Sequence, residues 1–324
     1  MAKVFSGIQP TGIIHIGNYL GAIKNWVELQ EEHDCLFSIV DLHSLTVPYD
    51  PKGLGDRIKD ALATNIAAGL DPEKATIFVQ SMVPEHTELT WLLTTITPVG
   101  NLERMTQYKE KSEKQGLLSG LLCYPILMAA DILLYKADLV PVGEDQIQHL
   151  ELTRVIARKF NSTFGEYFPE PQPKLSKATR VMALNDPTSK MSKSIPGSYI
   201  ALTDEPEEIR TKVKRAVTAS DVEGEVSPGV ANLFTLLEAF APKDVYNKFA
   251  KDLEDGNLKF SELKPALAEA IVEELTPIRE KRQELLAKPK FLEEVVAAGA
   301  DRARREAKQH MQEIKELMGL NLTF

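Results

Sequence analysis

The stretch KVFSGIQPTGIIHIGN, residues 3–18, carries the fold prediction for this chain of 324 residues. Residues 3–7 are expected to form a strand, and residues 35–40 are a continuous apolar run of the kind that forms a strand buried on both faces. The glycines that follow allow a tight turn, and a helix is expected from Asn18 to Glu31. The same alternation then repeats along the chain, with strands expected at 35–40 and 75–80 and helices at 57–70 and 84–96. Strands that alternate with helices predict parallel βαβ units with right-handed crossovers.

The second part of the chain continues this pattern and then changes. A helix is expected at 121–136, a strand at 139–142, a helix at 147–160 and a last strand at 181–184. Beyond about residue 200 the sequence favours helices only. We therefore predict an α/β protein with a Rossmann-like parallel sheet and a smaller all-helical C-terminal domain. The expected divisions are 1–200, with an insertion at about 100–135, then 201–290, and a C-terminal helix at 291–324 that packs back on the sheet domain.

Ligands of such sheets bind at the carboxyl ends of the strands, which directs attention to the residues after Ser6, Val40, Val142 and Leu184. Neither a P-loop nor a G-x-G-x-x-G motif is present. Instead, HIGN at residues 15–18 leads into a helix whose free N–H groups can hold negative charge. His15 could donate a hydrogen bond to a phosphate oxygen. Taken alone, this stretch could equally be an ordinary glycine-rich turn with a surface histidine.

A second phosphate signal is the pentapeptide KMSKS at residues 190–194. Lys190 and Lys193 lie three residues apart in a serine-rich loop, where they could close over a polyphosphate and offset the charge of departing pyrophosphate. Alone, this segment could also be a solvated basic loop.

Together, these two motifs resemble the HIGH and KMSKS signatures of the class I aminoacyl-tRNA synthetases. Asn18 departs from the last position of HIGH, and this departure is common in the tyrosyl and tryptophanyl branches. The resemblance implies a HUP-type catalytic domain that binds ATP with Mg²⁺, with no metal site built by the protein itself. The catalytic residues it implies are Lys190, Lys193, His15 and Lys111. The ATP-binding residues it implies are Gln9, Pro10, Thr11, Gly17, Asn18, Gly143, Glu144, Asp145, Val181, Lys190, Met191, Ser192, Lys193 and Ser194.

The segment YPILMAADILLY, residues 124–135, bears on the amino acid that is recognised. Tyr124, Met128 and Asp131 share one face of the expected helix and can line one pocket. A carboxylate in so apolar a helix is costly unless it is paired, and an indole N–H is a donor without acceptor capacity. Asp131 could accept that N–H. Alternatively, it could pair with a nearby lysine or cap a backbone group.

The same segment closely resembles the tryptophanyl branch, in which the matching aspartate reads the indole nitrogen and the methionine packs on the ring. The tyrosyl branch carries glutamine at the position of Met128. The sequence GEDQ at 143–146 also matches, and by resemblance Gln146 holds the charged end of the amino acid. The implied tryptophan-binding residues are Asp131, Met128, Tyr124, His43, Gln146 and Phe5. Leu42 stands where family members often have glutamine, so a polar contact is expected to be missing.

The resemblance implies an ATP-dependent ligase that forms tryptophanyl-adenylate and pyrophosphate and then transfers tryptophan to tRNA(Trp). It also implies a homodimer and an anticodon-binding region at 201–290. The net charge of −9 argues against general nucleic-acid binding, so tRNA contacts would need local patches. The candidate patches are the basic residues Arg210, Lys212, Lys214 and Arg215 and a second group, Arg302, Arg304, Arg305 and Lys308. Such clusters are more often solvated helix faces.

Sequence composition also bears on whether the protein is membrane-bound, secreted or cytoplasmic. No run of 18 apolar residues predicts a membrane span, no charged-then-apolar leader opens the sequence, and a cytoplasmic protein is expected. Three alternatives stay open: a tyrosyl branch member, a nucleotidylyltransferase with the same fold, and a non-catalytic paralogue that binds amino acid or RNA. Met128 and GEDQ disfavour the first, the helical C-terminal region and the complete KMSKS disfavour the second, and the presence of both lysines disfavours the third.

Overall fold

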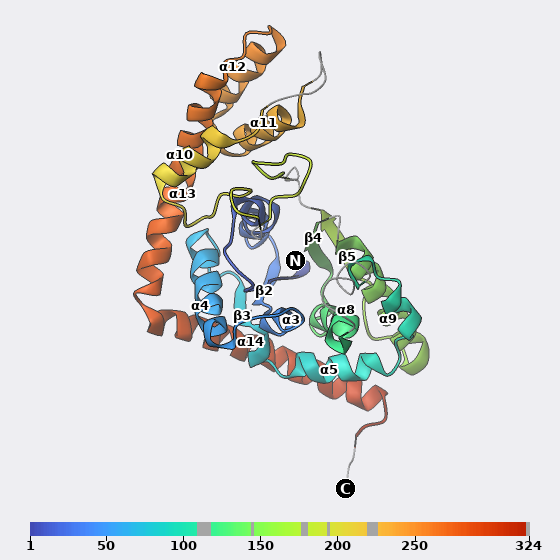
Figure 1. Cartoon of the computed structure of the whole chain (residues 1–324). Coiled ribbons are helices and arrows are strands. Elements are labelled where there is room, and N and C mark those ends of the chain that lie inside the picture. The colour runs from blue at the N-terminus through green and yellow to red at the C-terminus, as the bar shows by residue number, and fades with distance from the viewer. Residues whose placement is uncertain (109–117, 144–145, 176–180, 193–194, 219–225, 322–324) are drawn as a thin grey trace.

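The computed structural model describes residues 1–108, 118–143, 146–175, 181–192, 195–218 and 226–321. At its centre is a five-stranded parallel sheet in the order β3-β2-β1-β4-β5 (Figure 1). The predicted Rossmann-like α/β class is confirmed. The strands are β1 (Lys3–Ile8), β2 (Asp34–Ile39), β3 (Thr76–Val79), β4 (Leu139–Val142) and β5 (Gln172–Leu175).

Helices cover both faces of the sheet because successive residues of each strand point to opposite sides. Val4, Phe37 and Ile77 belong to one apolar core, whereas Phe5 and Phe78 belong to a second core. The first core includes residues of η1, α2 and α4, and the second includes residues of α5, α8 and α9. The helices before residue 165 are α1 (Ile16–Asn18), η1 (Tyr19–Ile23), α2 (Lys24–Leu29), α3 (Asp41–Ser44), α4 (Pro51–Ala67), η2 (Gln80–Met82), α5 (Glu85–Thr94), α6 (Val99–Glu103), α8 (Ser119–Leu133) and α9 (Ile147–Phe164).

The strand predicted at 181–184 is wrong, and the fifth strand is β5 instead. β5 is largely exposed and pairs on one side only, with β4, so its polar sequence QPKL and its Pro173 are tolerated at the sheet edge. Val181, Ala183 and Leu184 are buried without joining the sheet, since the only bridge described in this segment is antiparallel, between Met182 and Lys190. The apolar run at 181–184 is buried by packing against other segments and not by pairing in the sheet, which is why a strand was wrongly predicted there.

The C-terminal part consists of α10 (Pro206–Arg215), α11 (Pro228–Phe240), α12 (Lys243–Glu254), α13 (Phe260–Leu286) and α14 (Pro289–Leu317). α10 to α12 lie together above the sheet in the view of Figure 1. The long helix α13 contacts α10 and α11 and also reaches α4. No described helix is long and apolar enough to cross a membrane. The domain divisions at 200 and 290 stay a prediction.

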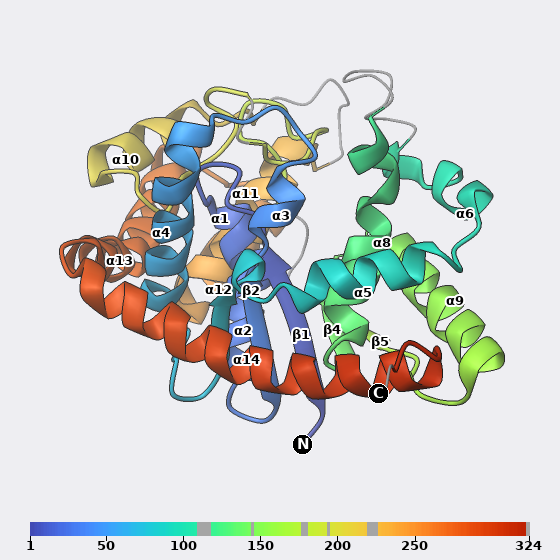
Figure 2. The same cartoon turned by 90° about the horizontal axis from the view of Figure 1, so that it is seen from below.

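Helix α14 covers the open edge of the sheet. It crosses in front of the strands in Figure 2 and contacts β3, the edge strand on that side. A Cβ on Gly299 would lie 1.8 Å from the carbonyl oxygen of Ile77, so the helix backbone rests directly on the strand backbone. Covering an edge in this way removes a template for pairing with other chains.

Candidate active site

A cavity of about 420 Å³ opens between the carboxyl ends of β1 and β4. The two strands are registered only at Val4 and Leu139, whereas β1 and β2 are registered along six residues. Pro141 has no N–H to donate, which contributes to this short ladder. The separation lies where the strand order reverses, which is the usual ligand crevice of such sheets.

The cavity brings together residues from six separate segments of the chain. All six residues predicted to bind tryptophan line it, and so do four of those predicted to bind ATP, namely Gln9, Gly17, Asn18 and Gly143. Pro10, Thr11, His15, Val181, Lys190, Met191 and Ser192 are described but do not line it. Lys111, Glu144, Asp145, Lys193 and Ser194 lie outside the described residues. The roles assigned to all of these residues stay predictions.

The HIGN segment forms a helix start with a defined histidine tautomer. His15 is the N-cap of α1, and its Nδ1 accepts the backbone N–H of Gly17 at 3.1 Å. Because Nδ1 accepts, Nε2 carries the ring proton in the neutral histidine and remains the donor. A Cβ on Gly17 would lie 2.9 Å from Cε1 of His15, so any larger residue would displace the ring.

Sequence reasoning missed that the helix after HIGN is interrupted by a π-helical turn. The expected helix at 18–31 is present as three consecutive segments, and the middle one, η1, has π-helical hydrogen bonding. Gly21 and Ala22 of η1 line the cavity. π turns are frequent at functional sites, since they reshape one helix face without ending the helix.

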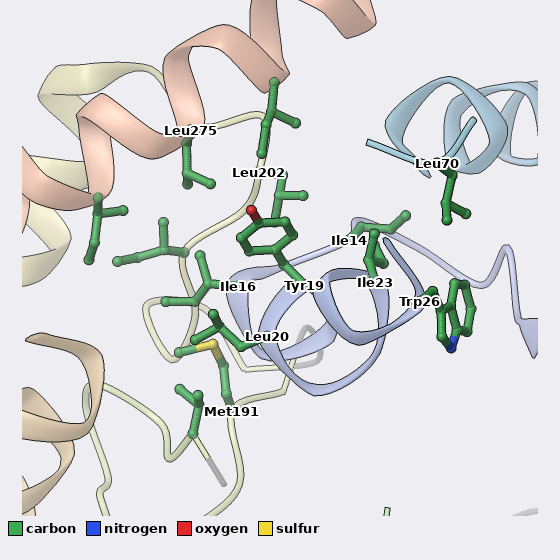
Figure 3. Close-up of a cluster of buried hydrophobic side chains, with 14 of the residues drawn as sticks. Ile14, Ile16, Tyr19, Leu20, Ile23, Trp26, Leu70, Met191, Leu202 and Leu275 are labelled. Atoms are coloured by element: carbon green, nitrogen blue, oxygen red, sulfur yellow. The ribbon is translucent and has the colours of Figure 1, made fainter. Parts of the chain in front are cut away.

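The KMSKS loop is attached to HIGN through Met191. Its side chain is buried beside Ile16 and Leu20 in the apolar cluster of Figure 3. Lys190, by contrast, is exposed. The preceding Met182 is bound at both backbone groups by Asn232 of α11, whose Oδ1 accepts from its N–H at 2.9 Å and whose Nδ2 donates to its carbonyl at 3.0 Å. The loop is thus tied to HIGN on one side and to the C-terminal helices on the other.

Asp131, in the wall of the cavity, accepts hydrogen bonds from three side chains. Its Oδ1 lies 2.7 Å from Nε2 of Gln80 and 2.7 Å from Nδ1 of His86, and its Oδ2 lies 2.9 Å from Nε2 of Gln80 and 2.9 Å from Nε2 of His43. The Asp131 carboxylate is only 2% exposed. Burial alone would raise the pKa of Asp131, but the hydrogen bonds from His43 and His86 outweigh it and lower the pKa to about 2. The carboxylate is therefore ionised at neutral pH.

The partners of Asp131 differ from the sequence alternatives. Its described hydrogen-bond partners include no lysine and no backbone group; they are one glutamine and two histidines. Gln80 and His86 were both missed. They follow β3, whose carboxyl end was not among the four segments selected, although the same rule of ligand binding at strand ends would have included it.

The other predicted ligand residues surround this carboxylate. Phe5 stacks on Tyr135 with ring centroids 5.7 Å apart. The hydroxyl of Tyr124 lies 2.7 Å from Nε2 of His149. The side chain of Leu42 is apolar, and its backbone N–H donates to Oε1 of Gln80 at 3.2 Å.

Several cations of the two predicted basic clusters are already engaged. Arg210 pairs with Glu207 and Glu269, and Lys212 pairs with Asp204 and Glu208. In the second cluster, Arg302 donates to the carbonyl oxygens of Pro72 and Ala75, and Arg304 approaches Glu85. These four side chains are therefore weaker candidates for phosphate contacts than the sequence indicated. Among the described residues, no group of three or more His, Cys, Asp or Glu could hold a metal ion.

Comparison with known proteins agrees with this geometry. Residues 1–276 match the family described as tRNA synthetases class I (W and Y). The chain is 47% identical over 329 residues to the tryptophan–tRNA ligase of Bacillus anthracis, an alignment that covers 99% of each chain. The tryptophanyl-tRNA synthetase structure from Mycoplasma pneumoniae superposes with a TM-score of 0.89 at 37% identity, covering 99% of this chain and 98% of the other.

A second solved structure is also similar over nearly the whole chain. The tryptophanyl-tRNA synthetase from Campylobacter jejuni, complexed with ADP and tryptophan, superposes with a TM-score of 0.86 at 35% identity and covers 98% of this chain and 99% of the other. The resemblance inferred from HIGN, KMSKS and the 124–135 segment is thereby confirmed. The chain belongs to the class I tRNA synthetases of the tryptophan and tyrosine family.

Proposed function

We propose that this chain is a tryptophan–tRNA ligase: it activates L-tryptophan with ATP, releases pyrophosphate, and transfers the tryptophanyl group to tRNA(Trp). The observation that carries the substrate assignment is the ionised, buried carboxylate of Asp131 in the wall of the cavity. A ligand that enters beside it must bring a hydrogen-bond donor, because an ionised carboxylate is an acceptor only. Tryptophan brings the indole N–H and an aromatic ring for Phe5 and Met128, which line the same cavity.

The selectivity of such a site comes from burial. A phenylalanine in the same place would offer Asp131 no donor, and sites built to hydrogen-bond a buried polar group reject analogues that lack it by about 10⁴-fold or more. The similarity to a synthetase complexed with ADP and tryptophan supports the same substrate pair.

The reaction proposed is in-line attack of the tryptophan carboxylate on the α-phosphorus of ATP, which forms the mixed anhydride and releases pyrophosphate. The protein then acts by positioning and by stabilising charge, with no covalent intermediate on a side chain. Gly17 and Asn18 line the cavity, and their backbone is assigned to the adenosine and phosphates of ATP. His15, the N-cap of this helix start, is assigned to a phosphate oxygen. Lys190 and Lys193 are assigned to the β- and γ-phosphates. Mg²⁺ is expected to arrive with ATP, held mainly by its phosphates.

We also propose that the chain works as a homodimer in the cytoplasm, with tRNA held by the helical C-terminal region. Support for the dimer comes from exposed apolar side chains near α5 and α8, where Trp91 is 68% exposed and Val99 and Leu118 are each 57% exposed. An interface within residues 80–135 would bury these exposed apolar groups.

The decisive experiment is ATP–pyrophosphate exchange with the purified chain and each of tryptophan, tyrosine and phenylalanine. We expect exchange with tryptophan at the lowest amino acid concentration, and charging of tRNA(Trp) in a second assay. Exchange that depends on tyrosine instead would contradict the assignment, and no exchange with any amino acid would favour the non-catalytic alternative.

A further inference from the structure

We propose that Gln80 and His86 are positioning residues that hold Asp131 in the orientation that reads the indole N–H, and that His43 is the donor that shares the carboxylate with the ligand. This inference rests on the proposed function and adds the group of residues that creates its specificity. None of these residues needs to react chemically. Gln80 and His86 act through Asp131 and do not line the cavity themselves.

The three donors to Asp131 differ in their position relative to the cavity. Gln80 and His86, called the rear pair, do not line it, whereas His43 does. Gln80 and His86 are each 0% exposed and lie behind the carboxylate, away from the described lining of the cavity. His43 does line the cavity and binds Oδ2 alone, at 2.9 Å. A ligand N–H that enters from the cavity can therefore approach Oδ2 beside His43, on the side opposite the Gln80 amide, which also lies 2.9 Å from Oδ2.

Each rear donor is itself fixed by a second hydrogen bond. Oε1 of Gln80 accepts the backbone N–H of Leu42 at 3.2 Å, so the amide can turn only its NH₂ group towards Asp131. The hydroxyl of Tyr135 lies 2.9 Å from Nε2 of His86. The ionised carboxylate of Asp131 can only accept, so Nδ1 of His86 carries the ring proton and donates it to Oδ1. In the neutral ring Nε2 is then an acceptor, and the hydroxyl of Tyr135 donates to it.

This arrangement matters because a buried carboxylate without donors would take up a proton. A protonated Asp131 would present an O–H group and lose part of its capacity to accept the indole N–H. A carboxylate held on one side only would also rotate, which weakens a directional bond. The rear pair is thus expected to affect tryptophan more than an isostere that has no N–H.

The test compares two amino acids in each variant, using ATP–pyrophosphate exchange. L-tryptophan carries the donor, and β-(3-benzothienyl)-L-alanine replaces the N–H by sulfur with nearly the same shape. The readout is the ratio of kcat/KM for the two substrates. A variant that merely loosens the fold lowers both values together and leaves the ratio unchanged, whereas loss of Asp131 orientation lowers the ratio itself.

Four variants are informative. Gln80→Met and His86→Leu remove one rear donor each, and we expect each to lower the ratio by about tenfold, which corresponds to about 1.4 kcal/mol. His86→Asn keeps a donor near Nδ1 and should retain most of the wild-type ratio. Tyr135→Phe removes one oxygen and should lower the ratio by a smaller factor, because His86 loses its second hydrogen bond.

The matched control is Gln30→Met. Gln30 is also a buried glutamine with two backbone hydrogen bonds, to Gly69 and Asp71, but it lies away from the cavity. It should leave the ratio unchanged even if the protein is less stable.

The outcomes separate the inference from the function on which it rests. A wild-type chain that does not activate tryptophan would refute the proposed function. A wild-type chain that does, together with ratios in Gln80→Met and Tyr135→Phe equal to that of the wild type, would overturn the inference and leave the function in place. Should His86→Leu fail to fold, these two smaller changes still decide.

Discussion

Replacing Asp131 by asparagine should lower the efficiency of tryptophan activation without unfolding the protein. Gln80 and His86 are expected to fix the orientation of the new asparagine amide. Because Gln80 and His86 both donate to the Oδ1 position, at 2.7 Å each, the amide oxygen is expected there. The NH₂ group then takes the Oδ2 position, where His43 can accept from it by changing tautomer. An incoming indole N–H therefore meets a donor instead of an acceptor.

The size of the effect follows from the bond that is lost. A hydrogen bond to a charged acceptor contributes about 1.5 to 3 kcal/mol, which corresponds to a decrease in kcat/KM for tryptophan of about 10- to 150-fold. The unpaired indole N–H adds to this decrease, so about tenfold is the lower bound. The KM for ATP should change little, because Gly17 and Asn18 are separate from this carboxylate. The assay is ATP–pyrophosphate exchange with tryptophan varied at saturating ATP.

The matched control is Asp138→Asn. Asp138 is an exposed carboxylate that accepts the backbone N–H of Lys3 at 2.7 Å and does not line the cavity. This variant should keep the wild-type kcat/KM for tryptophan. The reasoning would be refuted by an Asp131→Asn variant that is folded, as judged by circular dichroism, and activates tryptophan within about twofold of the wild type.

Three further predictions concern other parts of the molecule. Lys193→Ala should lower kcat of activation by more than it raises the KM for ATP, since its charge acts mainly on departing pyrophosphate; equal changes in steady-state kinetics would indicate uniform binding instead. Trp91→Asp should shift the chain towards monomer in sedimentation velocity runs over a range of concentrations, and an unchanged dimer would place the interface elsewhere. Gly299→Ala should lower the free energy of unfolding by about 1 to 3 kcal/mol in a denaturant titration, because its Cβ would overlap the backbone of Ile77. An unchanged midpoint and slope would mean that α14 can move away from β3 without cost.

The alternation of strands and helices was predictable because each element is specified locally. Apolar runs and helical spacing located β1 to β4 and the helices between them, and the spacing of Tyr124, Met128 and Asp131 placed them on one face of α8. The motifs HIGN and KMSKS are short and continuous, so their chemistry could be read from residue order alone.

Segments whose neighbours come from elsewhere in the chain could not be predicted in this way. The run at 181–184 is apolar because it packs beneath other segments, and β5 is polar because it lies at an edge; neither property is visible in the local sequence. Likewise, the salt bridge between Arg210 and Glu269 joins residues 59 positions apart. The local sequence of α10 gives no sign of this pairing, which makes Arg210 a weaker candidate for a phosphate contact with RNA.

For the candidate site, the sequence by itself determined which groups are available: a carboxylate in an apolar helix, a histidine before a helix start, and two lysines in a loop. Only the tertiary structure decided how they are partnered. Gln80 and His86 reach Asp131 across 51 and 45 residues of chain. The physical reason is that a side chain's chemical type is set by its own residue, whereas its charge state and orientation depend on the donors, acceptors and burial that distant segments bring to it.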